Sequence, residues 1–405
     1  MKTLKTDVVI LGAGNAALCA ALSARENNAQ VIVLERAPFE ERGGNSAFTA
    51  GAFRFAYDTV EELYEVVDDL SDQEKATTDF GTYSTGDFFD DMGRVTEYRT
   101  DPDLAELLIR NSRDTLLWMK RAGIRFQPSY GRQAFKVNDK FRFWGGLSIE
   151  AWGGGPGLVE SLHGAAQKAG IQVLYGTRAI DLIREDNLIV GVSGVSGGKP
   201  IEVRAKSVIL ASGGFEANGE WRARYLGPGW DLAKVRGTRF NTGDGIRMAL
   251  DAGAMSHGHW SGCHSVSWDR NAPGFGDLAV GDGFQKHSYP FGLMINARGE
   301  RFVDEGADFR NYTYAKYGGI VLGQPGQFAW QIFDAKVTHL LRDEYRIREV
   351  SRVTAASIAE LAAKLEGVDG GGLERTVAAF NAAVQGDIPF DPNVKDGRGT
   401  AGLEI

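Results

Sequence analysis

The chain has 405 residues, of which 43% are hydrophobic and 24% charged, the balance of an ordinary soluble globular protein. A single hydrophobic core does not grow to this length, so we expect two domains, and the net charge of −8 argues against nucleic acid or an anionic membrane as the main partner. No apolar stretch reaches the ~18 residues that span a bilayer, and the two cysteines lack the spacing of a redox dithiol or an iron-sulfur site. We expect a cytoplasmic protein in which any electrons reside on a bound cofactor.

The first elements in chain order predict half of a dinucleotide-binding fold. Residues 8–11 and 31–34 are apolar, β-branched runs typical of buried parallel strands, and residues 16–28 read as a helix between them. Strand, glycine turn, helix and strand make one βαβ unit. A positively charged start before an apolar stretch also resembles a signal peptide, but the acidic Asp7 and the second strand favour the βαβ interpretation.

The glycine turn carries the first chemical signal. Residues 12–17 read GAGNAA, a GxGxxA motif between strand and helix. Gly12 makes the turn, Gly14 lets a pyrophosphate approach the backbone, and Ala17 permits close helix packing. Glu35, at the end of the second strand, is placed to accept ribose hydroxyls and disfavours a 2′-phosphate. The motif therefore indicates NAD or FAD.

The middle of the chain continues this domain. Apolar residues at near-helical spacing predict a helix over 104–122 that packs in the core through Leu104, Leu107, Leu108, Leu116, Leu117 and Met119. The later elements predicted in chain order are a glycine loop at 153–157, a helix over 158–169, a strand over 171–174, an antiparallel meander over 179–203 with turns at 186–187 and 197–198, a buried strand over 207–210 and a helix ending near 252. Beyond 262 the pattern changes to mixed strands and helices, including helices over 358–365 and 373–384.

Four separated motifs decide between the two cofactors. They are RGGNSAFTAG at 42–51, ASGGF at 211–215, TGDG at 242–245 and GADFRNYT at 306–313. Together they resemble the fumarate reductase/succinate dehydrogenase flavoprotein family of FAD enzymes. Residues 14–22 (GNAALCAAL), 42–46 and 306–313 look most like its FAD-dependent tricarballylate dehydrogenase branch. The resemblance implies an α/β fold: a Rossmann-like FAD-binding domain over residues 1–262 with an inserted α+β capping domain over 263–405.

The resemblance also implies which residues hold FAD. Ala16 and Glu35 would bind the adenosine diphosphate half, and Ala179 would meet the adenine. Covalent members of the family carry a histidine where this chain has Asn45, so we predict non-covalent FAD. The ribityl and isoalloxazine side would involve Asn45, Ser46, Ala50, Gly51 and Asp244. The full predicted set is Gly12, Gly14, Ala16, Ala17, Glu35, Arg36, Gly43, Gly44, Asn45, Ser46, Ala50, Gly51, Ala179, Ala211, Ser212, Gly213 and Asp244.

The family interconverts a carbon-carbon single and double bond next to carboxylates. One hydrogen moves as hydride to flavin N5, and an arginine transfers the other as a proton. Arg310 matches that arginine, although this chain has one more residue than the family motif between the run 301–305 and the arginine. Because an arginine normally stays protonated, this role requires a strongly arranged site. The alternative is that Arg310 is a surface or ion-paired residue.

A histidine is the second predicted catalytic residue. His264 falls where the family places a substrate-binding histidine, and as a donor it would hold a substrate carboxylate. It is otherwise a structural histidine. His257 and His259 lie nearby, but no carboxylate or thiolate spacing completes a metal site, so we predict no metal.

Two departures from the family stand out. Its proton relay uses a glutamate and an arginine, and the matching positions here are Gln285 and Ser288, for which Lys286 or His287 would have to substitute. Family members also continue past the cap into a final segment that completes the flavin pocket. We expect that returning segment to be absent from the chain, which ends at Ile405.

The predicted function is FAD-dependent dehydrogenation of a small tri- or dicarboxylate, tricarballylate to cis-aconitate first. Reoxidation would need a separate electron acceptor, such as a membrane-associated redox protein. The alternatives are a fumarate-reductase-like or ketosteroid-dehydrogenase-like flavoenzyme, or a truncated, non-catalytic flavoprotein fragment.

Overall fold

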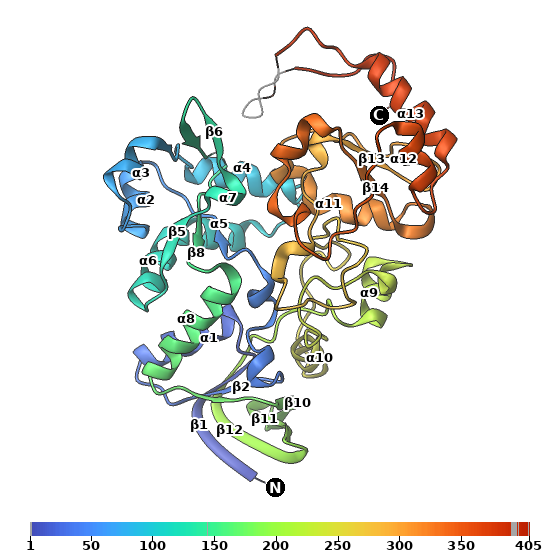
Figure 1. Ribbon diagram of the computed structural model, residues 1–405. Coiled ribbons are helices and arrows are strands. Elements are labelled where there is room, and N and C mark those ends of the chain that lie inside the picture. The colour runs from blue at the N-terminus through green and yellow to red at the C-terminus, as the bar shows by residue number, and fades with distance from the viewer. Residues whose placement is uncertain (1, 144, 390–394, 396, 404) are drawn as a thin grey trace. The chain divides into compact units, whose positions relative to one another are not determined.

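The computed structural model describes residues 2–143, 145–389, 395, 397–403 and 405 (Figure 1). Contacts divide the chain into two units. The first comprises residues 1–225, 235–260 and 275–281, and the second comprises 226–234, 261–274 and 282–405. The predicted domains, 1–262 and 263–405, follow one cut, whereas the units exchange two short segments. The predicted boundary stays a prediction.

A six-stranded sheet is the centre of the first unit. β1 pairs in parallel with β2 and β12, β2 pairs in parallel with β9, and β10, β11 and β12 form an antiparallel meander. The order is β10-β11-β12-β1-β2-β9. The strands span Lys2–Leu11 (β1), Val31–Leu34 (β2), Gln172–Leu174 (β9), Thr177–Glu185 (β10), Leu188–Ser196 (β11) and Lys199–Leu210 (β12). The predicted parallel strands, meander and hairpin turns are confirmed.

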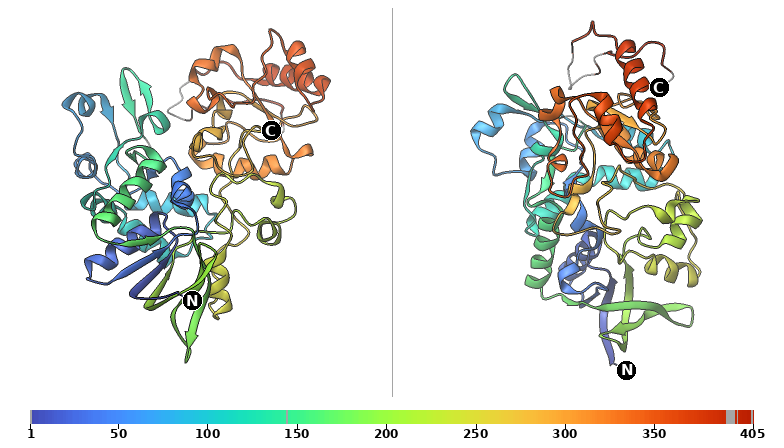
Figure 2. Two further views of the ribbon diagram at one scale, coloured as in Figure 1. Left: turned by 60° about the horizontal axis from the view of Figure 1, so that its bottom comes forward. Right: turned by 45° about the vertical axis from the view of Figure 1, so that its right-hand side comes forward.

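Helices cover both faces of this sheet, because successive side chains of a strand point to opposite faces. On one face, Ile10 and Val33 pack in a buried cluster with side chains of α1 (Asn15–Glu26) and α8 (Gly154–Lys168), among them Leu18 and Leu162. On the other face, Leu11 and its neighbours pack against Met248 of α10 (Asp244–Asp251). Figure 2 shows the strands and these helices from two further sides.

Smaller elements complete the first unit. Two three-stranded sheets have the orders β3-β8-β5 and β4-β7-β6. Their strands are Ala52–Phe53 (β3), Thr78–Asp79 (β4), Phe126–Pro128 (β5), Phe135–Val137 (β6), Lys140–Arg142 (β7) and Ile149–Ala151 (β8). The remaining helices are Val60–Val66 (α2), Asp72–Thr77 (α3), Thr85–Val95 (α4), Pro102–Arg110 (α5), Ser112–Arg121 (α6), Tyr130–Gln133 (α7) and Gly219–Leu226 (α9), with 3-10 turns at Phe39–Glu41 and Gly44–Phe48.

The second unit is built around a short antiparallel ribbon, β13 (Leu293–Ile295) with β14 (Trp330–Ile332). Leu293 and Ile295 pack against α12 (Ile358–Lys364) and α13 (Gly370–Ala383), whereas Met294 packs with Tyr317 of α11 (Arg310–Leu322). The unit's 3-10 turns are Trp230–Leu232, Tyr289–Phe291, Pro325–Gln327, Ala335–Leu340 and Asp343–Tyr345, and one more, Gly281–Phe284, begins at the last residue of the first unit. Across the residues described in both units, no helix is long and apolar enough to cross a membrane.

Three sequence predictions were wrong in detail. The glycine loop expected at 153–157 is for the most part the first turn of α8, which begins at Gly154. The expected helix over 104–122 is two helices, α5 and α6, and Leu104, Leu107 and Leu108 are 59%, 63% and 54% exposed rather than in the core. Ala105 and Ile109 supply the buried face of α5. The sequence did not identify this face, because apolar residues lie on both sides of the helix and their spacing does not say which side is buried. The strand over 207–210 is the end of the longer β12, and it is only partly buried.

The turn from β1 into α1 requires glycine. Gly12 has φ 99°, and a Cβ added there would lie 2.4 Å from the carbonyl oxygen of Ala211. Its N–H donates to Leu34 O at 2.8 Å, while the N–H of Ala211 donates to Leu11 O at 2.9 Å. The backbones that follow β1 and β12 therefore touch directly at this turn.

Gly12→Ala should lower stability and cofactor content together. The positive φ costs about 1–2 kcal/mol for a residue with a Cβ, and the clash with Ala211 adds to this cost. Gly123 is the matched control, because its φ is 104° but no described atom lies within 4 Å of its added Cβ. Thermal unfolding followed by absorbance should show a larger loss of Tm for Gly12→Ala than for Gly123→Ala. Equal losses would mean that the contact with Ala211 contributes nothing.

Candidate functional site

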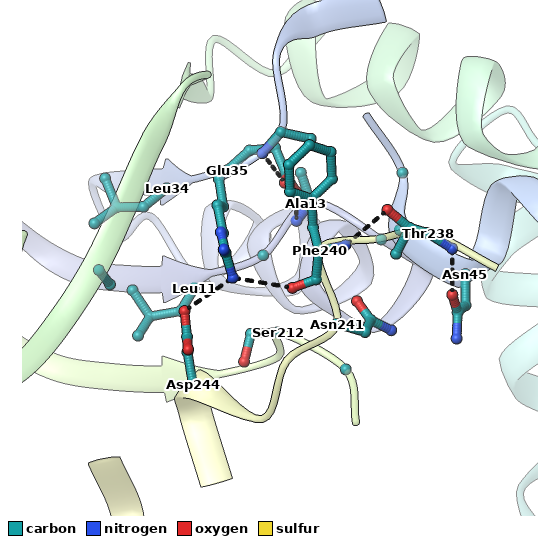
Figure 3. A pocket seen from close by; sticks show the side chains of 18 of the residues that line it. Leu11, Ala13, Leu34, Glu35, Asn45, Ser212, Thr238, Phe240, Asn241 and Asp244 are labelled. Carbon is teal, nitrogen blue, oxygen red and sulfur yellow. Dashed lines mark hydrogen bonds and ion pairs between the residues drawn. The ribbon is translucent and has the colours of Figure 1, made fainter. Parts of the chain in front are cut away.

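A cleft in the first unit opens where β1, β2 and β12 end, with an empty volume of about 850 Å³ that includes open solvent (Figure 3). Parallel α/β sheets bind their ligands at this edge. The cleft is lined by Leu11, Gly12, Ala13, Gly14, Asn15, Ala16, Leu34, Glu35, Arg36, Ala37, Gly43, Gly44, Asn45, Ser46, Thr177, Arg178, Ala179, Ser212, Gly213, Thr238, Phe240, Asn241, Asp244 and Met248.

The N-terminus of α1 faces this cleft. Its N-cap is Gly14, in extended conformation, and the first turn as described holds no acidic residue. The N–H of Asn15 donates to Ser46 Oγ at 3.0 Å, and both Asn15 and Ala16 line the cleft. The partial positive charge of a helix N-terminus and its backbone N–H groups suit a bound anion, above all a phosphate.

The Glu35 carboxylate is fixed by two backbone groups. Its Oε2 accepts from the N–H of Ala13 and its Oε1 from the N–H of Ala37, each at 2.7 Å. Burial raises the pKa of Glu35, although these N–H groups oppose the shift. Because a carboxylate offers about four acceptor positions, Glu35 keeps capacity for further donors such as ribose hydroxyls. The sequence located Glu35, and its bond to the glycine turn is new.

Asp244 joins two arginines across the cleft. Arg178 Nε and Nη2 donate to its carboxylate at 2.9 and 3.1 Å, and Arg36 Nη1 lies 3.3 Å from it. Burial by itself raises the pKa of Asp244, but the hydrogen bonds and charge of Arg178 and the charge of Arg36 hold it below its ordinary value. The predicted contact of Asp244 with a ribityl chain stays a prediction. The sequence did not identify Arg178 as a residue of the cleft, although it directly precedes the predicted Ala179.

Asn45 is held by a segment that the sequence did not single out. Its Oδ1 accepts from the N–H of Thr238 at 3.0 Å (Figure 3). Phe240 and Asn241 of the same segment also line the cleft. They lie almost 200 residues after Asn45 and directly precede the TGDG motif at 242–245, which did not include them.

Four of the predicted cofactor residues lie outside the described cleft lining. Ala17 is a fully buried residue of α1, in keeping with its packing role. Ala50 and Gly51 lie against the first turn of α8, where a Cβ on Gly51 would be 2.6 Å from the carbonyl carbon of Gly154. Ala211 supports the Gly12 turn from behind. The other predicted positions, from Gly12 to Asp244, line the cleft together.

The second unit brings the two predicted catalytic residues to one aromatic ring. The imidazole of His264 lies 5.1 Å from the Tyr314 ring, centroid to centroid, and Arg310 Cζ lies 5.8 Å from the same ring. Burial, and after it the charge of Arg342, lower the pKa of Arg310 to about 10. An arginine in this environment gives up a proton more readily than one in water.

The positions expected to hold a proton relay have different fates. Gln285 Nε2 donates to Asp282 Oδ2 at 2.8 Å, and Ser288 Oγ accepts from the N–H of Arg342 at 3.1 Å. The Lys286 ammonium lies 3.3 Å from Asp269 and donates to backbone carbonyl groups, including that of Glu344 at 3.0 Å. His287, by contrast, lies 4.7 Å from the Tyr314 ring. Of the two proposed substitutes, His287 therefore lies with His264 and Arg310 around the Tyr314 ring, whereas Lys286 stabilises the fold.

The other two histidines of this region belong to the first unit, whereas His264 belongs to the second. His257 Nε2 is 3.0 Å from Asp101, and His259 Nε2 is 3.5 Å from Arg99, all within the first unit. Among the residues whose positions are described, no group of three or more His, Cys, Asp or Glu side chains gathers as an ion site would require.

Comparison with known proteins identifies the family. A family model described as FAD binding domain matches residues 7–398. The chain belongs to this family. It is 30% identical over 397 residues to a fumarate reductase (cytochrome) of Shewanella frigidimarina, covering 96% of this chain and 63% of the relative. It is 26% identical over 410 residues to a 3-oxosteroid 1-dehydrogenase of Mycolicibacterium smegmatis, covering 84% and 68%.

A solved structure of the same kind agrees. The open conformation of a flavocytochrome c3 fumarate reductase matches with a TM-score of 0.66 and 26% identity, covering 94% of this chain and 61% of that one. The chain spans 59%, 63% and 60% of the lengths of three fumarate reductases that it matches. The resemblance to fumarate reductase flavoproteins is confirmed, and the tricarballylate dehydrogenase branch stays a prediction.

The cleft of this FAD-binding chain fits the adenosine diphosphate half of FAD. The N-terminus of α1 offers backbone N–H groups to the diphosphate. Glu35 keeps acceptor positions for ribose hydroxyls, and Ala179 lines the cleft beside the Asp244 cluster. The glycines at 12, 14, 43 and 44 keep the walls of the cleft free of side chains.

Lys286→Met should destabilise the second unit strongly. The change leaves the Asp269 carboxylate buried without its cation, and breaking one side of a buried pair costs about 3–5 kcal/mol. The double variant Lys286→Met, Asp269→Asn removes both charges and should recover part of the loss. Urea unfolding of the purified proteins measures both. A double variant no more stable than the single one would contradict this role of the pair.

Proposed function

We propose that the protein is an FAD-dependent oxidoreductase that interconverts a carbon-carbon single and double bond next to a carboxylate in a small di- or tricarboxylate. The observation that carries this proposal is the cluster of His264, His287 and Arg310 around Tyr314. Imidazole and guanidinium groups are the donors that recognise carboxylates. The same cluster contains an arginine whose pKa is lowered to about 10.

The roles of these residues follow from their chemistry. His264, which is exposed, donates a hydrogen bond to a substrate carboxylate. Arg310 gives a proton from its guanidinium to the substrate carbon during reduction, or takes it during dehydrogenation. Bound FAD supplies the two-electron chemistry as a hydride acceptor or donor.

Tricarballylate, converted to cis-aconitate, is the first substrate that we propose. The motifs at 42–46 and 306–313 support it. Fumarate reduction is the second candidate, because a relative 30% identical to this chain is named a fumarate reductase. A cationic and imidazole-rich cluster suits either acid better than a neutral steroid ring.

The redox partner and the mode of FAD attachment are part of the same proposal. The two cysteines do not provide a ligand set for an iron-sulfur cluster. We therefore propose a separate electron acceptor, such as a membrane-associated redox protein. We also propose non-covalent FAD, because Asn45 offers no nucleophile and its amide is bonded to Thr238. A cytoplasmic location stays a prediction of the sequence.

Anaerobic titration of the FAD-loaded protein tests the function. Tricarballylate should bleach the oxidised flavin absorbance, and acid precipitation should leave the flavin in the supernatant. If tricarballylate does not bleach it and fumarate reoxidises the chemically reduced protein, the second candidate replaces the first. A protein that takes up FAD but responds to neither acid contradicts the proposal, and one that takes up no FAD behaves as a non-catalytic fragment.

Arg310→Met should keep the flavin and lose turnover. The cleft residues lie in the first unit, whereas Arg310 lies in the second, so flavin content should stay near that of the wild type. Removal of a general acid-base group lowers rates by on the order of 10²–10⁴-fold. Lys336→Met, which removes an exposed cation of the second unit, is the control.

The dependence of the wild-type rate on pH tests whether Arg310 transfers the proton. Reduction requires protonated Arg310, so its rate should fall as pH rises through about 10, the lowered pKa of this residue. Dehydrogenation requires the neutral form and should speed up over the same range. Turnover of Arg310→Met equal to that of Lys336→Met would remove Arg310 from the mechanism.

A further inference from the structure

The Tyr314 ring is the shared neighbour of three functional side chains. Arg310 and Tyr314 are four residues apart on α11, which places them on the same helix face. The ring planes of His264 and His287 meet the Tyr314 ring at 72° and 64°, in edge-on geometry. The guanidinium of Arg310 lies within the range of a cation–π contact.

These three neighbours come from separate segments of the second unit. The segment carrying His264 is fastened to α11 by hydrogen bonds of the next residue: the N–H of Ser265 donates to Ala315 O at 2.8 Å, and the N–H of Gly319 donates to Ser265 Oγ at 2.9 Å. His287 precedes Ser288, whose N–H donates to the Tyr345 hydroxyl at 2.8 Å. The ring of Tyr314 contacts all three groups.

The start of α11 is also held firmly. The Tyr289 hydroxyl lies 2.5 Å from Thr313 Oγ1, and both side chains are buried. The Tyr317 hydroxyl donates to Asp304 O on the next turn. The contact between Tyr289 and Thr313 therefore holds the first turn of α11, and Arg310 Nη2 itself donates to Asn311 Oδ1 at 3.0 Å.

We propose that Tyr314 is a positioning residue whose ring, rather than its hydroxyl, orients Arg310 and His264. The inference rests on the proposed function for its kinetic test. An aromatic ring restricts the guanidinium over its face and gives each imidazole an edge to pack on. Phenylalanine presents the same aromatic ring, whereas leucine has no aromatic face for the guanidinium and is too narrow to contact both imidazoles.

The kinetic test compares Tyr314→Phe with Tyr314→Leu. The Phe variant should keep kcat and KM close to the wild type. The Leu variant should lose kcat/KM by on the order of 10²-fold, since misplacement of reacting groups by about 1 Å has an effect of that size. Both kcat and KM should change, because Arg310 acts on the proton and His264 on binding. Flavin content should stay constant.

Tyr317→Leu controls for the loss of a ring from α11. Tyr317 is buried on the same helix, and its ring contacts Tyr289 rather than His264, His287 or Arg310. It should lower Tm at least as much as Tyr314→Leu, with a much smaller loss of kcat/KM. An equal loss of kcat/KM would mean that helix packing, and not positioning, explains the effect, and would overturn the proposal.

A readout independent of turnover separates this inference from the proposed function. The chain has six histidines, and NMR of protein labelled at histidine, assigned with His264→Gln and His287→Gln, reports the ring environment of each. Tyr314→Leu should shift the signals of His264 and His287, and Tyr314→Phe should leave them in place. If the wild type turns over neither acid, the proposed function fails and these signals alone decide. Signals unmoved by Tyr314→Leu, or moved equally by Tyr314→Phe, overturn the proposal.

Discussion

The contact between Gly12 and Ala211 is the constraint on which the first unit depends. Two backbones from opposite ends of this unit's sequence meet there, and a Cβ would leave only 2.4 Å to the carbonyl oxygen of Ala211. Because they meet, the start of α1, the Glu35 carboxylate and Ser212 all line one cleft. The bond from Ala13 to Glu35 then fixes the turn to the end of the neighbouring strand. The geometry of the cleft that we propose for the diphosphate is thus a property of main-chain packing more than of any side chain.

The second unit brings charged groups together without a large sheet to support them. Its ribbon has only two short strands, and its polar groups are buried in pairs. Lys286 with Asp269 joins two segments, and Glu305, paired with Arg301, also accepts from the N–H of Met294 at 2.6 Å, while Arg310 and His264 meet at the Tyr314 ring. Groups of the same residue type therefore serve either the fold or the chemistry according to their partners. Arg310 differs from Arg301 because Arg301 faces a carboxylate, whereas the pKa of Arg310 is lowered by burial and by Arg342.

Most of the sheet and the glycine turn could be predicted, because their signals are local. Buried strands are apolar runs, hairpin turns carry Asp-Asn or Gly-Gly, and Glu35 follows its strand directly. Thr238, Phe240 and Asn241 could not, because they reach the cleft through tertiary packing alone. The face of α5 was misread because apolar residues occupy both of its sides. Lys286 and His287 are neighbours in sequence, and only the direction of each side chain separates a structural ammonium from a site imidazole.

One irregularity in the meander bears on how this chain tolerates change. β10 and β11 lose register between Ala179 and Asp181, so that Ile180 is an extra residue, and a second shift follows Ile183. Arg178, on the cleft side of both shifts, is bonded to Asp244. A bulge absorbs an added residue by a local bend instead of turning every side chain to the opposite face. A residue inserted at the tip of this hairpin, near Asp186, can therefore be absorbed without displacing the ion pair of Arg178 with Asp244.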